Sequence, residues 1–264
     1  MIKSSIKIGA LLRVYTQNAH SISSVVQGVA SAIETLARAG IDDIQIVVWA
    51  ERNNRAADCG ETFEALEERL MSRSGVHFIK VVEGDLFVDA LNQGVAAQRE
   101  RGITHSLILS WEAASAVDGN ILDTIKKALE EGALVVGVAL PELAEFVEQG
   151  AVMNTCALWD LDALEAVGGF DTRDTKPREV HHYGGSNAGI GEFLPMLKMV
   201  KHFGRPILAV VRPTRRSAIA VPLERQELQR QKLESKSRRI AGMLAQTGYT
   251  WNDLHAAIMP GYPR

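Results

Sequence analysis

The sequence predicts an α/β fold built on a doubly wound, mostly parallel β-sheet, followed by a long C-terminal helical extension. Two observations predict it. Aliphatic runs alternate with segments of helical periodicity, and few polar residues interrupt those runs. Unbroken aliphatic strands have both faces covered, and a helix between two strands makes them parallel. The 264 residues are enough to bury a large core.

The first half of the chain contains five expected strands with a helix in each interval. The expected strands cover residues 6–16, 44–50, 76–82, 105–111 and 133–140. The expected helices cover residues 21–40, 62–75, 85–102 and 120–131. The serines that begin the first helix and Gly40, which ends it, are typical capping residues.

The second half is less regular. It contains an expected strand at 151–160, a short helix at 161–170, a polar loop at 171–189, a helix at 190–204, a strand at 205–214 and a long charged helix at 222–248. That last helix has few apolar positions, namely Leu223, Leu228, Leu233, Ile240, Met243 and Leu244. It either lies on its own domain or pairs with a second copy in a homodimer. We therefore divide the chain into an α/β domain, 1–217, and a helical extension, 218–264.

Composition excludes several classes of protein. The net charge of −3 provides no general attraction for nucleic acid. No apolar run reaches the ~18 residues that span a bilayer, and the N-terminus has no evident cleavage signature. Cys59 and Cys156 have no metal-binding or redox spacing, which favours a reduced, cytoplasmic protein.

Ligands of an open α/β sheet bind outside the carboxyl ends of its strands, so the residues that follow each strand are the candidates for a site. No G-x-G-x-x-G follows the first strand, and neither a P-loop nor a G-x-S-x-G motif is present. These absences remove the main support for dinucleotide binding, P-loop chemistry and serine hydrolysis.

The most specific stretch is NTCALWDLDALEAVGGFDTR, residues 154–173. Gly168 and Gly169 are expected to close its helix in a left-handed turn, with Phe170 in the core and Asp171 at the rim of the site. The stretch resembles the Gly-Gly-Phe-Asp segment of family 2-type glycosyltransferases with the GT-A fold. The order of elements over roughly residues 5 to 215 is also similar to that family.

The resemblance implies a nucleotide-diphospho-sugar transferase-like fold and a nucleotide-sugar donor whose base and diphosphate meet the first, second and fourth strand ends. Tyr15 falls where the family frames the base. Trp49 and Glu51 fall within the stretch that corresponds to its Val-Asp-Asp-Gly run. Trp49 cannot accept the hydrogen bonds of the family's acid, although its face can stack on a base.

Ser110, Trp111 and Glu112 replace the family's metal-binding Asp-x-Asp, so this motif is degenerate and keeps one carboxylate. Glu112 with Mn²⁺ or Mg²⁺ can suffice if the diphosphate supplies other oxygens, and His181 or His182 can add an imidazole ligand. Alternatively, Arg212, with Arg215 and Arg216, meets the diphosphate without a metal. The alternative for the two histidines is that they face solvent and bind no metal. The alternative for the three arginines is that they form a basic surface turn without a ligand.

Glu192 falls where the family has the acid that deprotonates the acceptor hydroxyl. Its alternative is a glutamate that only interacts with a helix dipole. Trp111 either stacks on the acceptor or fills core space.

The first functional hypothesis is a hexosyltransferase-type enzyme that moves a sugar from a nucleoside-diphosphate donor to the hydroxyl of an unknown acceptor. The alternative is a non-catalytic GT-A-fold protein that recognises a ligand or serves as an assembly subunit. A nucleotidyltransferase is disfavoured because no Gly-rich, Arg- or Lys-bearing loop follows the first strand.

Overall fold

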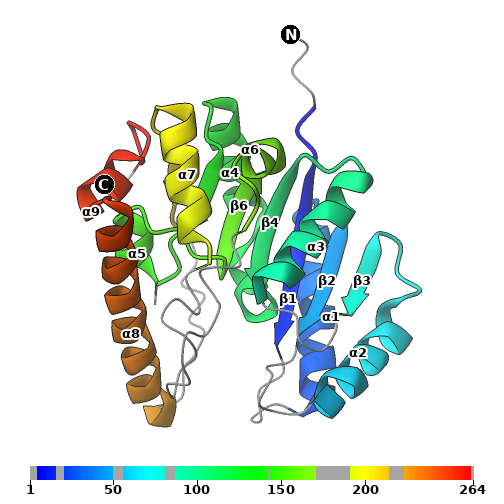
Figure 1. The fold of residues 1–264 in the computed structure, drawn as a ribbon. Helices are drawn as coiled ribbons and strands as arrows, with labels where there is room; N and C mark the ends of the chain where they lie inside the picture. Colours follow the sequence, from blue (N-terminus) through cyan, green and yellow to red (C-terminus); the bar gives the residue numbers. More distant parts are fainter. Residues whose placement is uncertain are drawn as a thin grey trace.

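The computed structural model describes residues 5–15, 21–49, 56–80, 87–141, 143–170, 191–213 and 223–262. Within them lies a seven-stranded sheet of order β3-β2-β1-β4-β6-β5-β7 (Figure 1). Its strands are β1 Ile8–Tyr15, β2 Ile44–Trp49, β3 Val76–Lys80, β4 His105–Ser110, β5 Val135–Val138, β6 Cys156–Asp160 and β7 Leu208–Val211. Strand β6 is antiparallel to both of its neighbours, and the other pairs are parallel.

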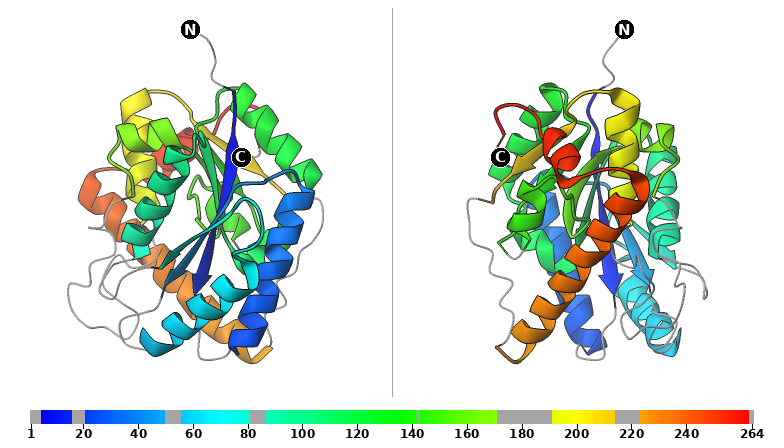
Figure 2. Two further views of the ribbon diagram at one scale, coloured as in Figure 1. Left: turned by 90° about the vertical axis from the view of Figure 1, so that its right-hand side faces the viewer. Right: turned by 60° about the vertical axis from the view of Figure 1, so that its left-hand side comes forward.

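The helices cover both faces of the sheet. Their bounds are α1 Ile22–Arg38, α2 Ala56–Leu70, α3 Phe87–Glu100, α4 Gly119–Glu130, α5 Ala144–Glu148, α6 Leu161–Ala166, α7 Phe193–Phe203, α8 Leu223–Thr247 and α9 Trp251–Ala256, with a 3₁₀ helix η1 at Trp111–Ala116. Helices α1 and α4 lie on one face and α3, α6 and α7 on the other (Figure 2). The structure thus confirms the predicted α/β class and its mostly parallel sheet.

The alternation of strand side chains divides the core into two layers. In β1, Ala10, Leu12 and Val14 join the cluster beneath α1, α2 and α4, whereas Leu11 joins the cluster beneath α3, α6 and α7. Because both layers are apolar, a charged residue in a central strand is conspicuous, and Arg13 is one.

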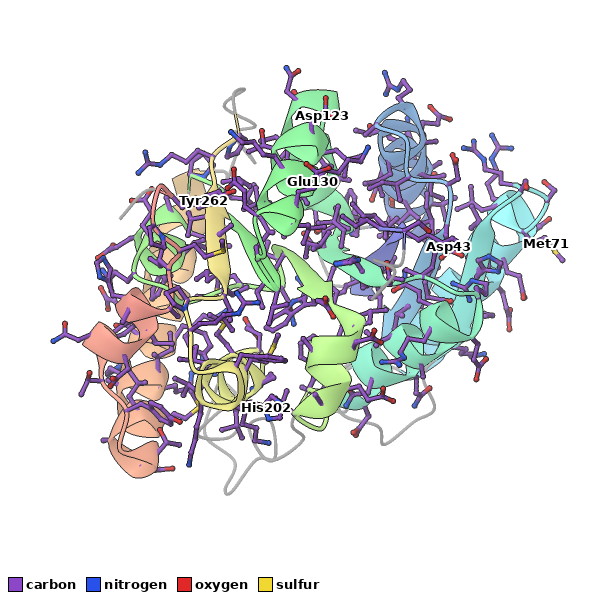
Figure 3. The ribbon with its side chains drawn as sticks, turned by 90° about the horizontal axis from the view of Figure 1, so that it is seen from above. Asp43, Met71, Asp123, Glu130, His202 and Tyr262 are labelled. Carbon is purple, nitrogen blue, oxygen red and sulfur yellow. The ribbon has the colours of Figure 1, made fainter. Side chains whose placement is uncertain are left out.

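The C-terminal extension packs on the α/β domain. Ile240, Met243 and Leu244 of α8 are buried in the second core layer. Beyond α9, Ile258 forms a parallel bridge with Leu208, and the Tyr262 hydroxyl donates to Glu131 beside α4 over 2.8 Å (Figure 3). Docking on its own domain is therefore observed, while pairing with a second copy and the 217/218 boundary stay predictions.

The departures from the expected elements are local. Helix α2 begins at Ala56, six residues earlier than expected, and β4 ends at Ser110 because Trp111 starts the 3₁₀ helix. Helices α5 and α9, of 5 and 6 residues, are too short for a periodic signal. No helix in the described part of the chain is long and apolar enough to cross a membrane.

Candidate functional site

The carboxyl ends of β1 and β4 form the point where the strand order reverses, since the chain proceeds from β1 to β2 and β3 on one side and to β4 on the other. Arg13 of β1 is the register partner of Ser110 of β4. Tyr15 of β1 is likewise the partner of Trp49 of β2. The backbones of these four residues therefore lie at the edge where α/β proteins bind ligands. The side chains of Tyr15 and Trp49 are outside the described part.

Ser110 caps η1, because its Oγ accepts a hydrogen bond from the Ala113 amide over 3.3 Å. The hydroxyl that stands in place of the first acid of Asp-x-Asp is thus used by the backbone. Glu112, in the first turn of η1, interacts electrostatically with Arg13.

Trp111 packs against α1. A Cβ added to Gly28 would overlap the ring of Trp111, so this tryptophan contacts the helix where a glycine makes room for it. The ring also belongs to the rim of the first core layer. This contact matches the core-filling alternative for Trp111, and stacking on an acceptor stays a prediction.

A partly buried ionic cluster lies near these strand ends and consists of Arg13, Glu112, Glu192, Lys236 and Arg239. Lys236 Nζ donates to Glu192 Oε1 over 3.3 Å, and the two side chains are only 18% and 6% exposed. Arg13 interacts electrostatically with both carboxylates and Arg239 with Glu192. The five residues come from β1, η1, the start of α7 and α8, so tertiary packing assembles the cluster.

Burial has the largest effect on the pKa values of the three cations in the cluster. It lowers the pKa of Arg13, against the opposing effect of Glu192 and then Glu112. Burial also lowers the pKa of Lys236 and of Arg239, and Glu192 opposes it in both cases. Burial raises the pKa of the Cys156 thiol to about 12, although the charge of Arg13 opposes this rise. The cysteine is therefore a thiol at neutral pH.

Helix geometry explains how α8 supplies two cations. Lys236, Arg239, Ile240 and Met243 are spaced i, i+3, i+4 and i+7, which places them on one face of a helix. Ile240 and Met243 are buried in the core, so their docking directs Lys236 toward Glu192. Glu192 is the N-cap of α7 yet makes no side-chain capping bond, because its carboxylate faces Lys236.

The Gly-Gly-Phe turn has the predicted conformation. Gly168 and Gly169 have φ of +89° and +75°, and Phe170 is 2% exposed and packs edge-on against Trp159. Asn92 of α3 holds the turn, since its Nδ2 donates to Phe170 O over 2.8 Å and its Oδ1 accepts from Phe170 N over 2.9 Å. Asp171 is outside the described residues.

The remaining predicted site residues are dispersed. Arg212 follows β7 and forms a surface ion pair with Glu148 of α5 at 2.9 Å, with 56% of its side chain exposed. Strand β7 lies four positions from β1, about 19 Å at the usual strand spacing, so Arg212 stands apart from Arg13. Glu51, His181 and His182, like Arg215 and Arg216, fall outside the described residues.

The described side chains do not fit a divalent cation at this edge. Among them, no group of three or more His, Cys, Asp and Glu residues is placed to hold a metal ion. Glu112 is one carboxylate, Ser110 is used as a cap, and Arg13 adds a positive charge that would repel a second cation. His181 and His182 as metal ligands stay a prediction.

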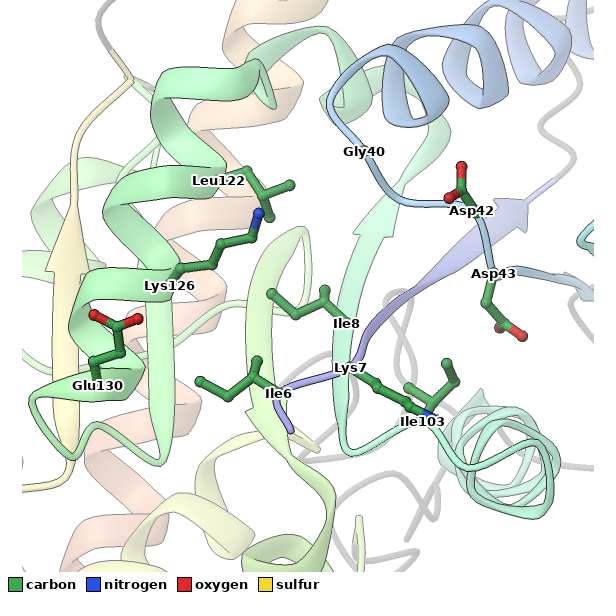
Figure 4. A pocket seen from close by; sticks show the side chains of 10 residues that line it. All are labelled: Ile6, Lys7, Ile8, Gly40, Asp42, Asp43, Ile103, Leu122, Lys126 and Glu130. Carbon is green, nitrogen blue, oxygen red and sulfur yellow. The ribbon is translucent and has the colours of Figure 1, made fainter. Parts of the chain in front are cut away.

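The amino ends of the same strands border an open pocket of about 490 Å³, shown in Figure 4. Its walls carry apolar, acidic and basic side chains, from Ile6, Ile8, Asp42, Lys7 and Lys126 among others. Asp43 at its rim already accepts two bonds from Arg101, at 2.7 and 2.9 Å. The pocket thus lies at the opposite edge of the sheet from the ionic cluster.

Three members of the cluster were not assigned from the sequence. Arg13 was visible as a charge inside the aliphatic strand ALLRVY, which is a sign of a functional or paired residue. Lys236 and Arg239 were hidden in a helix rich in charges, although their spacing to Ile240 and Met243 marks the docked face.

No protein-family model matches the chain, and no curated protein matches it either. Among solved structures, it is similar to a cytidylyltransferase from Leptospira borgpetersenii, at 12% identity over 81% of this chain and 79% of that one, with a TM-score of 0.45. A putative glucose-1-phosphate thymidylyltransferase from Bacillus anthracis is similar at 10% identity, over 78% of this chain and 86% of that one, with a TM-score of 0.44. A putative nucleotide-diphospho-sugar transferase from Desulfovibrio desulfuricans is similar at 11% identity, over 90% of this chain and 98% of that one, and its TM-score is also 0.44. Since all three scores lie below 0.5, the functional argument rests on the chain's own site.

Proposed function

We propose that the protein is a transferase that uses a nucleoside-diphosphate sugar as donor and passes the sugar to an acceptor hydroxyl. The observation that carries the proposal is the partly buried cluster of charged residues near the reversal point of the strand order. Its centre is the buried Glu192 with Lys236, and such clusters of partly buried charge are common at functional sites. The carboxyl edge is also where α/β sheets bind nucleotides.

In this proposal the diphosphate lies at the cluster, near Arg13 and Glu112. The base lies over the ends of β1 and β2, which carry Tyr15, Trp49 and Glu51. The bond between the anomeric carbon and the phosphate oxygen breaks, and the nucleoside diphosphate leaves with the electron pair. The acceptor oxygen forms the new bond to carbon, so a carboxylate at the acceptor side must take its proton as general base.

Glu192 is the proposed proton acceptor. Its Oε1 is bound to Lys236, so Oε2 is the atom that would take the proton. A carboxylate held by a buried lysine keeps a fixed orientation, which favours general-base action when the hydroxyl comes within hydrogen-bond reach.

A non-catalytic protein that binds the same donor is the second candidate. Two observations favour it. The Glu192 carboxylate already accepts a hydrogen bond from Lys236, and the Ser110 hydroxyl caps the helix η1. Both candidate functions predict that the protein binds the donor, but only the transferase predicts turnover of the donor.

The first test is thermal unfolding of the full chain with UDP, GDP, CDP and UDP-sugars, each with Mn²⁺ and with a chelator. A ligand at about a hundred times its Kd stabilises the folded protein by ~2.7 kcal/mol, which is a Tm shift of roughly 5–10 °C for a domain of this size. A shift with one nucleotide identifies the donor base. Absence of a shift with every nucleotide would refute the proposal.

The second test separates catalysis from binding. With the donor identified, release of its nucleoside diphosphate is measured in the wild type and in Glu192→Gln, which removes the proton acceptor and keeps the shape. A transferase loses turnover by about 10²–10⁴-fold in the variant, the usual contribution of a general base. Donor binding with no turnover in the wild type would instead support the non-catalytic candidate.

A further inference from the structure

Two charged residues from distant parts of the chain meet near the carboxyl edge of the sheet. Lys236 of the C-terminal extension donates a hydrogen bond of 3.3 Å from its Nζ to Oε1 of Glu192, and the two side chains are 18% and 6% exposed. We propose that Lys236 is a positioning residue of the reaction, which holds the Glu192 carboxylate in place and keeps it unprotonated. This inference rests on the proposed function, because it assigns a residue that acts through the proposed proton acceptor.

The packing of α7 and α8 fixes the backbone on both sides of this hydrogen bond. Phe193, which follows Glu192 in the chain, is 1% exposed, and Ile240, one turn after Lys236, is 0% exposed. Both belong to the apolar layer beneath α3, α6 and α7. Because the same core layer anchors both partners, tertiary packing sets the separation of the two backbones.

The stability of the fold does not require a charged pair at this place. Two buried ions lose hydration that their mutual attraction only partly restores, and apolar side chains of similar size often stabilise a fold equally well. The neighbouring positions of both helices show that alternative, since Phe193, Ile240 and Met243 are buried among apolar side chains. The chemistry of the carboxylate therefore explains the pair better than the docking of α8 does.

The positive charge of Lys236 favours the ionised form of its partner. Burial alone favours the neutral form of a carboxyl group, whereas a bonded ammonium group favours the carboxylate. Arg13 of β1 and Arg239 of α8 also interact electrostatically with Glu192, and Glu112 of η1 interacts with Arg13. Lys236 adds to the two arginines through a direct hydrogen bond. Since only an ionised carboxylate can take the proton of the acceptor hydroxyl, this charge affects proton transfer as well as orientation.

The test compares two substitutions of Lys236 in the full chain. Lys236→Gln keeps a hydrogen-bond donor and removes the charge, whereas Lys236→Arg keeps the charge. Arg238→Gln is the matched control, because Arg238 is exposed on the same helix. Release of the nucleoside diphosphate from UDP-glucose, UDP-N-acetylglucosamine and GDP-mannose is measured as a function of pH, and thermal unfolding establishes that each variant is folded.

We expect Lys236→Gln to lower kcat by about tenfold or more at neutral pH and to leave KM for the donor within about twofold, because the lysine acts on proton transfer and not on donor binding. The acidic limb of the pH–rate profile should move upward by about one pH unit or more, the usual effect of losing a neighbouring opposite charge. Lys236→Arg should restore most of both properties, and Arg238→Gln should change neither.

A double variant shows whether Lys236 acts through Glu192. If it does, adding Lys236→Gln to Glu192→Gln should lower turnover no further, because the group on which the lysine acts has already lost its charge. A lysine that only supports the fold, or one that binds the donor, would add its own loss to that of Glu192→Gln.

Two outcomes overturn the inference and leave the proposed function intact. In the first, the wild type turns over the donor and Lys236→Gln keeps its kcat and its pH profile. In the second, Lys236→Gln raises only KM for the donor, or adds its full loss to that of Glu192→Gln. Absence of release from all three donors in the wild type at every pH would overturn the inference and the proposed function together.

Discussion

Charged residues are arranged differently at the two edges of the sheet. At the amino edge, Asp43 accepts two hydrogen bonds from Arg101, of 2.7 and 2.9 Å, and His77 Nε2 lies 3.7 Å from the same carboxylate. At the carboxyl edge, Arg13, Lys236 and Arg239 interact with Glu192, and a hydrogen bond of 3.3 Å joins Lys236 to Glu192. The first arrangement joins residues of neighbouring loops and strands, whereas the second joins charged residues from β1, η1, the start of α7 and α8.

This difference separates a structural pair from a candidate site. A pair whose donors and acceptors match needs no ligand, and the open pocket of about 490 Å³ beside Asp43 has lining charges of both signs. The charged network at the other edge lies at the carboxyl ends of the strands, where α/β sheets bind ligands. The volume of an opening is therefore a poorer guide here than the position of a charged network in the sheet.

Breaking the Lys236–Glu192 pair should give the largest effect. Lys236→Met leaves the buried carboxylate of Glu192 without its lysine and should cost about 3 kcal/mol, the lower end for such pairs because Arg13 and Arg239 still face it. Urea unfolding measures the free energy. Adding Glu192→Gln to Lys236→Met should recover most of the loss, and equal instability of the single and double variants would contradict this.

The amino-edge counterpart is Asp43→Asn. Asp43 and Arg101 are 17% and 26% exposed, so water can reach the guanidinium when its partner is lost. We expect a loss of about 1–2 kcal/mol, between the values for exposed and buried pairs. A loss as large as that of Lys236→Met, in the same urea experiment, would show that the two edges do not differ as argued.

A further change tests the packing that positions Glu112. Gly28→Ala places a methyl group against the ring of Trp111 and should destabilise by about 1–2 kcal/mol, since overpacking exceeds the gain in helix propensity. Gly242→Ala in α8 meets no atom within 4 Å and should stabilise by about 0.5–1 kcal/mol. The midpoint of denaturation should therefore fall in Gly28→Ala and rise in Gly242→Ala. A change of the same sign in both variants would contradict the contact between Gly28 and Trp111.

Much of the fold was readable from the sequence because the strands are continuous aliphatic runs and the helices between them are amphipathic. The direction of β6 was not, because the segment between β5 and β6 contains only the short helix α5 and so has no clear crossover signal. The glycine turn before Phe170 was predictable because two consecutive glycines after a helix permit positive φ.

The candidate site was only half predictable. Ser110 ends β4, Glu112 lies two residues beyond it, and Glu192 lies next to a helix start, so position along the chain identified them as candidates. Lys236 reaches Glu192 across 44 residues and Arg13 across more than 200, and such contacts depend on how α8 docks. The periodicity of α8 indicated which face docks, but not which strand end that face would meet.

The smallest predicted effect concerns His105 at the amino edge, whose Nδ1 lies 2.8 Å from Thr104 Oγ1 and whose Nε2 lies 3.6 Å from Asp160. Burial lowers its pKa, and Asp160 opposes that effect. The unfolded chain therefore binds a proton at a higher pH than the folded one, so stability falls as the pH drops through about 6.5, the ordinary histidine value. His105→Gln should flatten this dependence in urea titrations between about pH 7.5 and 5, whereas His202→Gln, at an exposed position (Figure 3), should not. An unchanged slope in His105→Gln would mean that Asp160 balances the effect of burial, and a steeper fall of stability at low pH would mean that Asp160 outweighs it; either result would contradict the prediction.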